Sequence, residues 1–447
     1  MEAAHPLVVR RRVEVRQVGI ATLAAGLLAL FLALGVGLGR QPLPMPLVLA
    51  FGVGLLGTLA LALARYDAAV VVGVFLIAAV RVEPAPSDLV FAVVIAVAFV
   101  TWRFDLERVP LSITLLVSAF LALNLIASIE VIDPARAVTF FAITLYLGVL
   151  GLWLAGYVRS VRRARLVIGA YLAAAGLSAA LACLALLAPF PGSELFVTGP
   201  RAQGLFKDPN VFGPFLVPAA LVLMEEAVGP RLLRLRLATK LGLLSIVSLG
   251  VLFSFSRAAW LNLAVGTIVL LFVLALRRGG ARKAMGLLAV TLAAGAALFA
   301  VTAATSSLTF LEQRAAVQVY DTQRFGAQLS GVELASEHPL GVGPGQFERI
   351  SEISAHSTYV RALAEEGVLG LLAVLALMLL TLGFAARNAA SGVNCYGIGS
   401  AALFAAWCGL LANSLFVDTL HWRHLWLVAA LIWAATALRV RNPYPGS

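Results

Sequence analysis

Long apolar runs separated by short polar segments make up most of this chain. A helix needs roughly 20 residues to cross about 30 Å of hydrocarbon. Runs of that kind predict twelve membrane spans: 18–39, 43–64, 111–129, 137–157, 166–188, 211–228, 238–255, 258–276, 284–304, 367–386, 396–415 and 424–438. Two shorter runs, 68–80 and 88–102, fit tilted helices, a re-entrant pair or short packed helices equally well. Because they enter as a pair, the alternation of sides along the chain is unaffected.

The composition agrees with a membrane protein and excludes a soluble enzyme, a disordered scaffold or a secreted disulfide framework. Of the 447 residues, 61% are hydrophobic and 12% charged, and the mean hydropathy is +0.98. Polar residues are therefore too few to cover a water-facing surface. The three cysteines, Cys183, Cys395 and Cys408, lie in or beside apolar runs without the spacing of a zinc site or a disulfide lattice.

The basic residues predict the orientation of the spans. Strong clusters occur at Arg10, Arg11, Arg12 and Arg16; at Arg159, Arg162, Arg163 and Arg165; at Arg231, Arg234, Arg236 and Lys240; and at Arg277, Arg278, Arg282 and Lys283. If the spans alternate, all four clusters fall on one side, together with 22 of the 33 basic residues. Positive loops stay in the cytoplasm, so both termini are predicted to be cytoplasmic. The net charge of +11 has this explanation, and no nucleic-acid partner is predicted.

The chain divides into four parts under this topology. We predict N-terminal transmembrane helices over 1–188, a helical part with the first external arginine-bearing loop over 189–304, a large external loop over 305–366, and C-terminal helices over 367–447. The fold class is an all-α polytopic membrane protein with about 12–14 transmembrane helices. Cytoplasmic loops are short and lack the GxxxxGK[ST] motif, which argues against primary active transport.

Basic residues on the external side call for a different explanation, because the orientation rule disfavours them. They include Arg201 and Lys207 in the first external loop, Arg257 at the mouth of a helix, and Arg314 and Arg324 in the second loop. A guanidinium offers five donors in a fork that matches phosphate oxygens. We therefore predict a diphosphate clamp here, with snorkelling to lipid headgroups as the alternative for Arg257.

The second external loop carries the densest motif, SEHPLGVGPGQFERISEISAHSTYVRALAEEGVLG at 336–370. The stretch with His338, Gly341 and Gly343 predicts a defined non-helical turn. From Ala355 the pattern turns helical, so that His356 is expected near a helix start, where N–H groups favour anions.

A helical spacing of three and four residues follows, through Tyr359, Leu363, Glu366 and Gly370. Histidine is readily poised as a general base near neutral pH, which makes His356 a candidate catalytic residue; a structural, hydrogen-bonded role is the alternative.

The acidic residues of the second loop predict a solvated helix face rather than a metal site. They are Glu333, Glu337, Glu348, Glu352, Glu365 and Glu366. No HExxH or DxD motif occurs, and the short first external segment holds Arg40 and Gln41 where an acidic pair would bind a divalent ion. We predict no metal and no cofactor, so that arginines must neutralise any phosphate.

In its C-terminal half the chain resembles the O-antigen ligase and O-antigen polymerase superfamily of bacterial envelope glycosyltransferases, which are multi-span proteins of GT-C-like type. The resemblance is carried by four stretches in order: RAQGLFKDPNVFG at 201–213, FSFSRAAW at 253–260, QRF at 323–325 with HPLGVGPGQF at 338–347, and AHSTYVRALAEEGVLG at 355–370. The N-terminal spans match only in being hydrophobic.

The resemblance implies an enzyme of the bacterial inner membrane whose active site faces the periplasm or exterior. Such an enzyme takes a glycan from an undecaprenyl diphosphate-linked donor and joins it to a glycan or lipid-linked acceptor, without metal. By position, Arg201 and Arg257 would hold the diphosphate with Arg324 as a third ligand, and His356 would be the base. Many relatives have Asn after this histidine, where this chain has Ser357. Attack opposite the leaving group implies inversion at the anomeric carbon.

Three alternatives remain open at the level of sequence. A polysaccharide or lipid-carrier transporter would keep polar residues or broken helices at mid-membrane in related halves, and the chain shows no such repeat. A non-catalytic assembly protein could hold a lipid diphosphate with the same arginines. Within the enzyme class, a ligase and a polymerase differ only in the acceptor, which one sequence does not identify.

Overall fold

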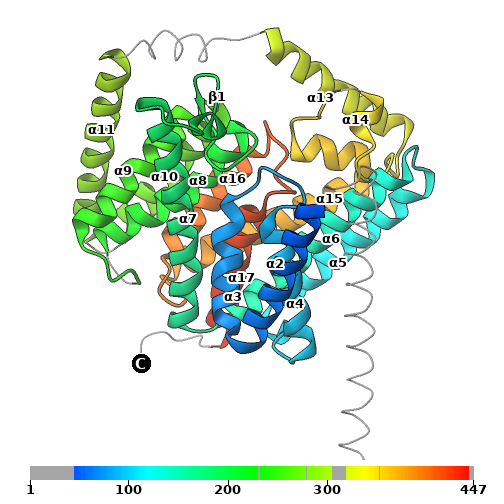
Figure 1. The fold of residues 1–447 in the computed structure, drawn as a ribbon, viewed down its shortest axis with the longest axis horizontal. Helices are drawn as coiled ribbons and strands as arrows, with labels where there is room; N and C mark the ends of the chain where they lie inside the picture. Colours follow the sequence, from blue (N-terminus) through cyan, green and yellow to red (C-terminus); the bar gives the residue numbers. More distant parts are fainter. Residues whose placement is uncertain (1–44, 230–231, 278, 305–318, 352, 442–447) are drawn as a thin grey trace, which may run out of the picture.

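The computed structural model describes residues 45–441 except 230–231, 278, 305–318 and 352, and its helices form one bundle (Figure 1). The helices on predicted spans are α2 (Met45–Ala64), α5 (Leu111–Ala127), α6 (Pro134–Tyr157), α7 (Val161–Leu187), α8 (Pro209–Val228), α9 (Leu237–Phe253), α10 (Arg257–Leu276), α11 (Gly280–Ala304), α15 (Thr358–Ala390), α16 (Ser400–Asn413) and α17 (Arg423–Arg441). The two short runs form α3 (Tyr66–Phe75) with the 3₁₀ turn η1 (Leu76–Ala78), and α4 (Pro86–Val100).

The all-α polytopic membrane fold is confirmed. Six helices among the described residues are long and apolar enough to cross a membrane, and further apolar helices are shorter. The first long external loop forms the turn η4 (Ser193–Phe196) and a hairpin of β1 (Val197–Thr198) and β2 (Arg201–Ala202), and the second contains α13 (Val319–Glu337) and α14 (Phe347–Ile350). The predicted span 18–39 and the basic cluster before it lie outside the described residues.

Both short runs cross the bundle. Asp67, in the first turn of α3, accepts a hydrogen bond from Arg162 Nη1 at the start of α7 at 2.7 Å. At the other end, the Val80 N–H donates to the Leu205 carbonyl, beyond the end of α7, at 3.0 Å. α3 and η1 therefore run alongside α7 from one end of the bundle to the other. α4 runs back to the end where α3 begins, because Arg103, just after α4, lies over the ring of Tyr66 at the start of α3.

Side-chain caps set where several helices begin. Asp133, Ser160, Asp208, Ser256 and Ser357 each accept a hydrogen bond from a backbone N–H two or three residues further on. Such a cap satisfies one of the N–H groups that a helix start leaves unpaired, and losing it costs about 1 kcal/mol. These caps begin α6, α7, α8, α10 and α15, so α15 starts three residues later than the sequence pattern alone suggests.

The ion pairs of the described residues gather at two opposite ends of the bundle. The basic end is defined by the pairs Arg162–Asp67, Arg159–Asp105, Lys240–Glu226 and Arg277–Glu225. The loop end is defined by the pairs Lys207–Glu83, Arg136–Glu348, Arg361–Asp418 and Arg423–Asp88. Each pair joins segments that the predicted alternation of spans places on the same side. The pairing therefore supports the alternation, and which end faces the cytoplasm stays a prediction.

At the loop end, α15 is interrupted at Gly367, whose φ of 71° and ψ of −171° are not helical. The break exposes carbonyl groups of the preceding turn, and the turn over 338–345 satisfies them. The Val342 N–H donates to the Ala364 carbonyl at 3.0 Å, and the Gly343 N–H donates to the Glu365 carbonyl at 2.9 Å. The glycine-rich turn predicted from the sequence is thus the cap of a broken helix.

The carboxylate of Glu365 completes the same junction from the helix side. It accepts hydrogen bonds from the backbone N–H groups of Gly345 at 2.8 Å and Phe347 at 3.3 Å. Phe347 and Glu365 are 0% and 2% exposed. Because a buried N–H without a partner costs about 1–3 kcal/mol, these bonds fix the turn against the first part of α15.

We expect Gly341→Ala to destabilise the protein by about 2 kcal/mol or more, from left-handed strain and a backbone clash. Gly341 has a φ of 85°, and a Cβ there would lie 2.3 Å from the Glu365 carbonyl oxygen. The measurement is the unfolding temperature of the purified protein in detergent. Gly383→Ala, on α15 with nothing within 4 Å of its Cβ position, is the matched control and should be neutral or stabilising. Equal unfolding temperatures for the two variants would contradict the capping role.

Candidate functional site

His356 lies at the loop end, in the segment that leads into α15. Its φ is 46°, a left-handed conformation that is uncommon outside glycine. The cap formed by Ser357 starts α15 directly after it, and its carbonyl accepts a hydrogen bond from Gln328 Nε2 of α13 at 3.4 Å. The predicted position of His356 near the helix start is therefore confirmed, and two elements hold the backbone there.

The imidazole of His356 is neutral at pH 7. Burial lowers its pKa from 6.5 to about 4, and the positive charges of Arg324 and Arg361 act in the same direction. Asp208 and Glu348 raise the pKa but are outweighed. A neutral imidazole has a nitrogen lone pair available, which is the form that a general base or a hydrogen-bond acceptor requires.

Arg201 and Arg257 occupy one corner of the loop end, where the β1–β2 hairpin meets the connection between α9 and α10. Arg201 Nε donates to the Ser254 carbonyl at 2.9 Å, three residues before Arg257. Its Nη2 donates to Asn210 Oδ1 in the first turn of α8, also at 2.9 Å. Both arginines are half-buried. The structure thus brings together two residues that the sequence separates by more than fifty positions.

Asp208 connects this corner to the histidine. It caps α8 by accepting a hydrogen bond from the Asn210 N–H at 2.8 Å, and its charge acts on His356. Arg324 is half-buried on α13, and its positive charge lowers the pKa of His356. Arg201, Arg324 and His356 therefore belong to one polar region. Arg314, the fifth predicted basic residue, lies outside the described residues.

Lys207 lies at the same end but is engaged in an ion pair. Its Nζ is 2.8 Å from Glu83 Oε1, with both side chains about half exposed. Its backbone N–H donates to the Val80 carbonyl at 3.1 Å. An exposed pair of this kind contributes about 0–1 kcal/mol, so a phosphate could compete for the ammonium group. The structure gives Lys207 a second role, that of attaching the first loop to the segment after η1.

Arg361 is a buried cation that the sequence reasoning did not single out. It is 5% exposed, and its guanidinium pairs with Glu348, with Asp418 at 3.2 Å and with Glu365 at 4.0 Å. The same Glu348 pairs with Arg136 of α6. Arg361 therefore joins α14, α15 and the segment between α16 and α17. The sequence signal that could have pointed to Arg361 was its position in STYVRALAEEG, about one helical turn after His356.

The arginines of this network lower the pKa of the Glu348 carboxyl group. Burial raises the pKa of its carboxyl group, but Arg361 and Arg136 beside it outweigh that effect and hold the pKa below its ordinary value. Glu348 is therefore ionised at neutral pH and keeps both arginines oriented.

A second histidine, His421, lies beside this network at the loop end. Its Nδ1 is 3.8 Å from Asp418. Its Nε2 is hydrogen-bonded to Thr144 Oγ1 at 3.1 Å. Burial lowers the pKa of its imidazole.

The remaining residues predicted for the loop motif have structural positions. His338 is exposed, and its carbonyl accepts the Gly341 N–H at 2.8 Å within the turn. Gly343 has a φ of 98°. Tyr359 is half-buried and its hydroxyl donates to the backbone of α16 at 3.2 Å. Glu366 is 7% exposed beside the break in α15.

The prediction of a solvated acidic face is wrong for part of the loop. Glu365 and Glu366 are buried and Glu348 is half-buried, whereas Glu333 and Glu337 on α13 are exposed. Glu352 lies outside the described residues. The physical reason is the break at Gly367, which turns the first part of α15 across the loop end and buries the side chains that a continuous helix would present to water.

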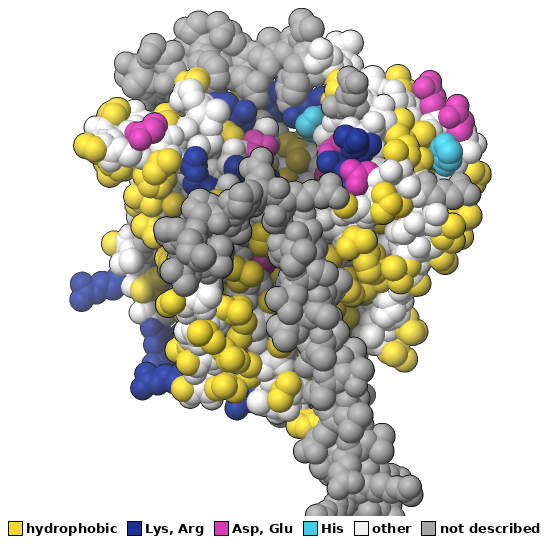
Figure 2. Space-filling model, turned by 45° about the vertical axis from the view of Figure 1, so that its right-hand side comes forward, with side chains coloured by type: hydrophobic (Ala, Val, Ile, Leu, Met, Phe, Trp, Pro, Cys, Tyr) yellow, Lys and Arg dark blue, Asp and Glu magenta, His cyan; other side chains and the backbone are white. Residues whose placement is uncertain are grey.

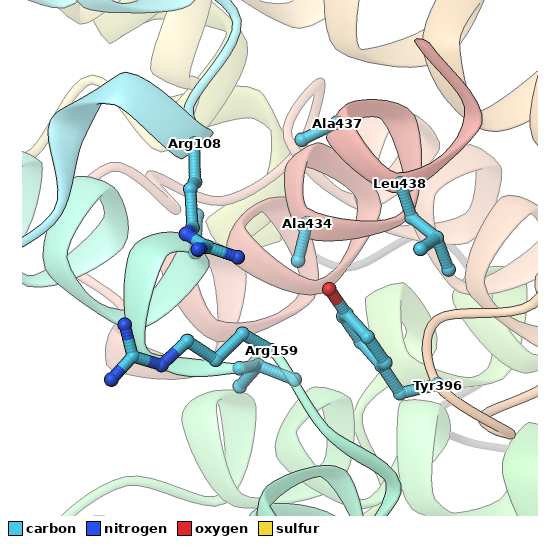
Figure 3. A pocket seen from close by; sticks show the side chains of 8 residues that line it. Arg108, Arg159, Tyr396, Ala434, Ala437 and Leu438 are labelled. Atoms are coloured by element: carbon cyan, nitrogen blue, oxygen red, sulfur yellow. The ribbon is translucent and has the colours of Figure 1, made fainter. Parts of the chain in front are cut away.

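Figure 2 shows acidic, basic and histidine side chains together in the upper part of the molecule, above a surface with many hydrophobic side chains; further Lys and Arg side chains lie at the lower left. The pocket in Figure 3 is a different feature, at the basic end, where Arg108, Arg159 and Tyr396 line it together with small and aliphatic side chains. Its volume is about 10 Å³, which is room for roughly one water molecule. Arg108 and Arg159 both pair with Asp105. The pocket is too small for a glycan, and its two cations already have a carboxylate partner.

Comparison with known proteins identifies one family. The family model described as O-antigen ligase matches residues 242–375. This stretch runs from α9 to α15 and includes Arg257, Arg324, His356 and Arg361, whereas Arg201 lies before it. No curated protein matches the chain at a significant level. The match confirms the resemblance stated from the sequence and supports glycosyl transfer in general.

We expect His356 to make the folded protein less stable as the pH falls from about 6.5 to about 4. In this window the unfolded chain binds a proton that the folded chain, with its pKa near 4, does not bind. Above 6.5 the histidine is neutral in both states and contributes no pH dependence. The measurement is the unfolding temperature in detergent between pH 7.5 and 4.5. His356→Gln should lose less stability over this range than the wild type, and parallel curves would contradict the burial of a neutral imidazole.

Proposed function

We propose, because residues 242–375 carry an O-antigen ligase family domain, that this polytopic protein is a glycosyltransferase acting on a lipid-linked glycan. The donor is an undecaprenyl diphosphate-linked glycan and the acceptor is a sugar hydroxyl. The reaction is metal-independent and inverts the anomeric carbon. The observation that carries the proposal is a neutral histidine, His356, in the same polar region as three arginines from separate segments.

The arginines supply the charge stabilisation that the leaving group requires. When the bond between the anomeric carbon and the phosphate oxygen breaks, negative charge grows on the diphosphate. Arg201 and Arg257, with Arg324 from α13, present guanidinium groups to that charge. Positioned donors in a site shielded from water are often the largest single contribution to catalysis.

His356 takes the proton of the acceptor hydroxyl. The acceptor oxygen forms a bond to the anomeric carbon as the diphosphate leaves from the opposite face, and the proton moves to an imidazole nitrogen. A pKa near 4 makes a weak base in the unliganded protein. A bound diphosphate adds negative charge beside Arg324, so it counteracts one cause of the low pKa and makes the base stronger when the donor is present.

The site faces the periplasm or exterior of a bacterial inner membrane in this proposal. The positive-inside rule supports this orientation, because the basic end carries the arginine clusters and the loop end carries His356. The polyprenyl tail would enter from the bilayer between helices while the second loop covers the sugars.

Purified, reconstituted protein should transfer glycan from an undecaprenyl diphosphate-linked donor in the presence of EDTA, with the products identified by mass. His356→Gln should lower kcat by about 10²–10⁴-fold, the usual contribution of a general base, while donor binding is retained. Arg257→Gln should lower kcat and, unlike His356→Gln, should also weaken donor binding. Arg282→Gln, exposed at the basic end, is the control and should match the wild type.

The products separate the possible activities. A ladder of lengthened carrier-linked glycans indicates a polymerase, and one glycan moved to an added acceptor indicates a ligase. Full activity of His356→Gln would remove the histidine from the mechanism. Absence of product with any acceptor, together with movement of the carrier lipid across liposomes, would overturn the transferase proposal in favour of transport.

Cysteine labelling in intact cells tests the orientation separately. Leu195→Cys, 50% exposed between α7 and α8, should react with a membrane-impermeant maleimide. Arg282→Cys should react only after the membrane is permeabilised. Cys183 and Cys395 are buried and Cys408 is half-buried, so the native protein provides the background. The reverse labelling pattern would place His356 on the cytoplasmic side.

A further inference from the structure

An apolar groove between α3 and α7 has one cation at its end. The groove has a volume of about 440 Å³. It is lined by Val72 and Phe75 of α3, by Leu76 of η1, and by Arg165, Leu166, Gly169 and Ala173 of α7. Its size lies in the range of small-molecule sites. The helix repeat places Arg165, Gly169 and Ala173 in one row along α7, so the arginine stands at one end of an apolar channel.

The groove lies within the part of the protein that faces hydrocarbon. α7 is one of the candidate membrane spans, with a mean hydropathy of 2.1. Val72 and Phe75 are 38% and 36% exposed, and nothing lies within 4 Å of a Cβ built at Gly169. The missing side chain leaves a depression between two helices that an unbranched hydrocarbon chain can enter.

Among the described residues, Arg165 differs from the other arginines of its cluster because it has no carboxylate partner. Arg162 and Arg163 pair with Asp67, and Arg159 pairs with Asp105. Arg165 Nε donates to the Leu232 carbonyl at 3.1 Å. Within the part of the chain that the structure describes, no carboxylate lies within ion-pair distance of Arg165. A half-buried guanidinium at a membrane boundary is stabilised by an anion. Among the described residues, Arg165 has a carbonyl acceptor but no anionic partner.

We propose that this groove binds one anionic phospholipid, with an acyl chain between α3 and α7 and the headgroup phosphate on Arg165. Basic pockets between membrane helices recognise anionic headgroups in this way. The groove is separate from the candidate catalytic site. Arg165 lies near Arg162 at the basic end, whereas His356 lies at the loop end. The lipid is therefore a bound structural partner of the bundle and not the glycan donor.

Native mass spectrometry of delipidated protein, to which phosphatidylglycerol or phosphatidylcholine with the same acyl chains is added back, tests the proposal. The wild type should retain phosphatidylglycerol preferentially. Arg165→Gln should lower the preference for phosphatidylglycerol about fivefold, the effect of one basic residue at a membrane surface. Gly169→Leu, whose Cβ would meet nothing within 4 Å, places a side chain in the groove. It should lower retention of both lipids about tenfold, since a few displaced methylene groups lose that much binding.

Arg282→Gln removes an exposed arginine at the same end and should leave lipid retention unchanged. The unfolding temperature of each variant without added lipid establishes that it is folded. Equal retention of both lipids by wild type and variants would mean unspecific surrounding lipid and would overturn the proposal. Retention of neither lipid by the wild type, with Gly169→Leu less stable in the absence of lipid, would mean that another segment such as 18–39 fills the groove, and would also overturn it.

Discussion

The backbone hydrogen bonds between the 338–345 turn and the interrupted helix α15 hold the loop end together. A helix that stops at Gly367 leaves carbonyl groups without partners, and Val342 and Gly343 donate to them. This contact positions two segments of the candidate site. It fixes the start of α15, where His356 precedes the helix, and it places Phe347 and Glu348 against Arg361. A buried backbone group has to find a partner, and that requirement determines how the large loop folds over the bundle.

Charge is arranged around this junction in two ways. Arg361 lies among carboxylates, so that its charge is balanced and its side chain is held in place. Arg201 and Arg324 lie in the polar region of His356, where Asp208 and Glu348 raise the pKa of the imidazole and Arg324 and Arg361 lower it. The paired charges around Arg361 hold structure in place, whereas we propose that the arginines near His356 bind an anionic substrate. The same distinction appears at the basic end, where Arg165 stands apart from three arginines that have carboxylate partners.

Much of the fold could be predicted from the sequence, because a membrane span has one dominant requirement, about 20 apolar residues. The alternation of sides was equally accessible, and the ion pairs agree with it. The motif around His356 also gave the correct local structure, since Ser357 caps the helix that follows. The burial of Glu365 and Glu366 could not be predicted, because it depends on a break that only tertiary contacts with the turn explain. Arg361 was missed because its burial depends on tertiary contacts, which include Asp418 from the segment between α16 and α17.

The bidentate pair between Arg423 of α17 and Asp88 of α4 has a consequence for biosynthesis. The two residues are 335 positions apart, and Asp88 is 7% exposed in the finished protein. At a synthesis rate of about 5–20 residues per second, α4 is made roughly 15–70 s before its cation exists. During that interval the carboxylate of Asp88 lacks Arg423 and has its local hydrogen bond from the Ala85 N–H, at 2.9 Å in the finished protein. The contact between α4 and α17 can therefore form only after α17 has been made, and a ribosome that stops before α17 releases a chain whose α4 lacks this ion pair at the loop end.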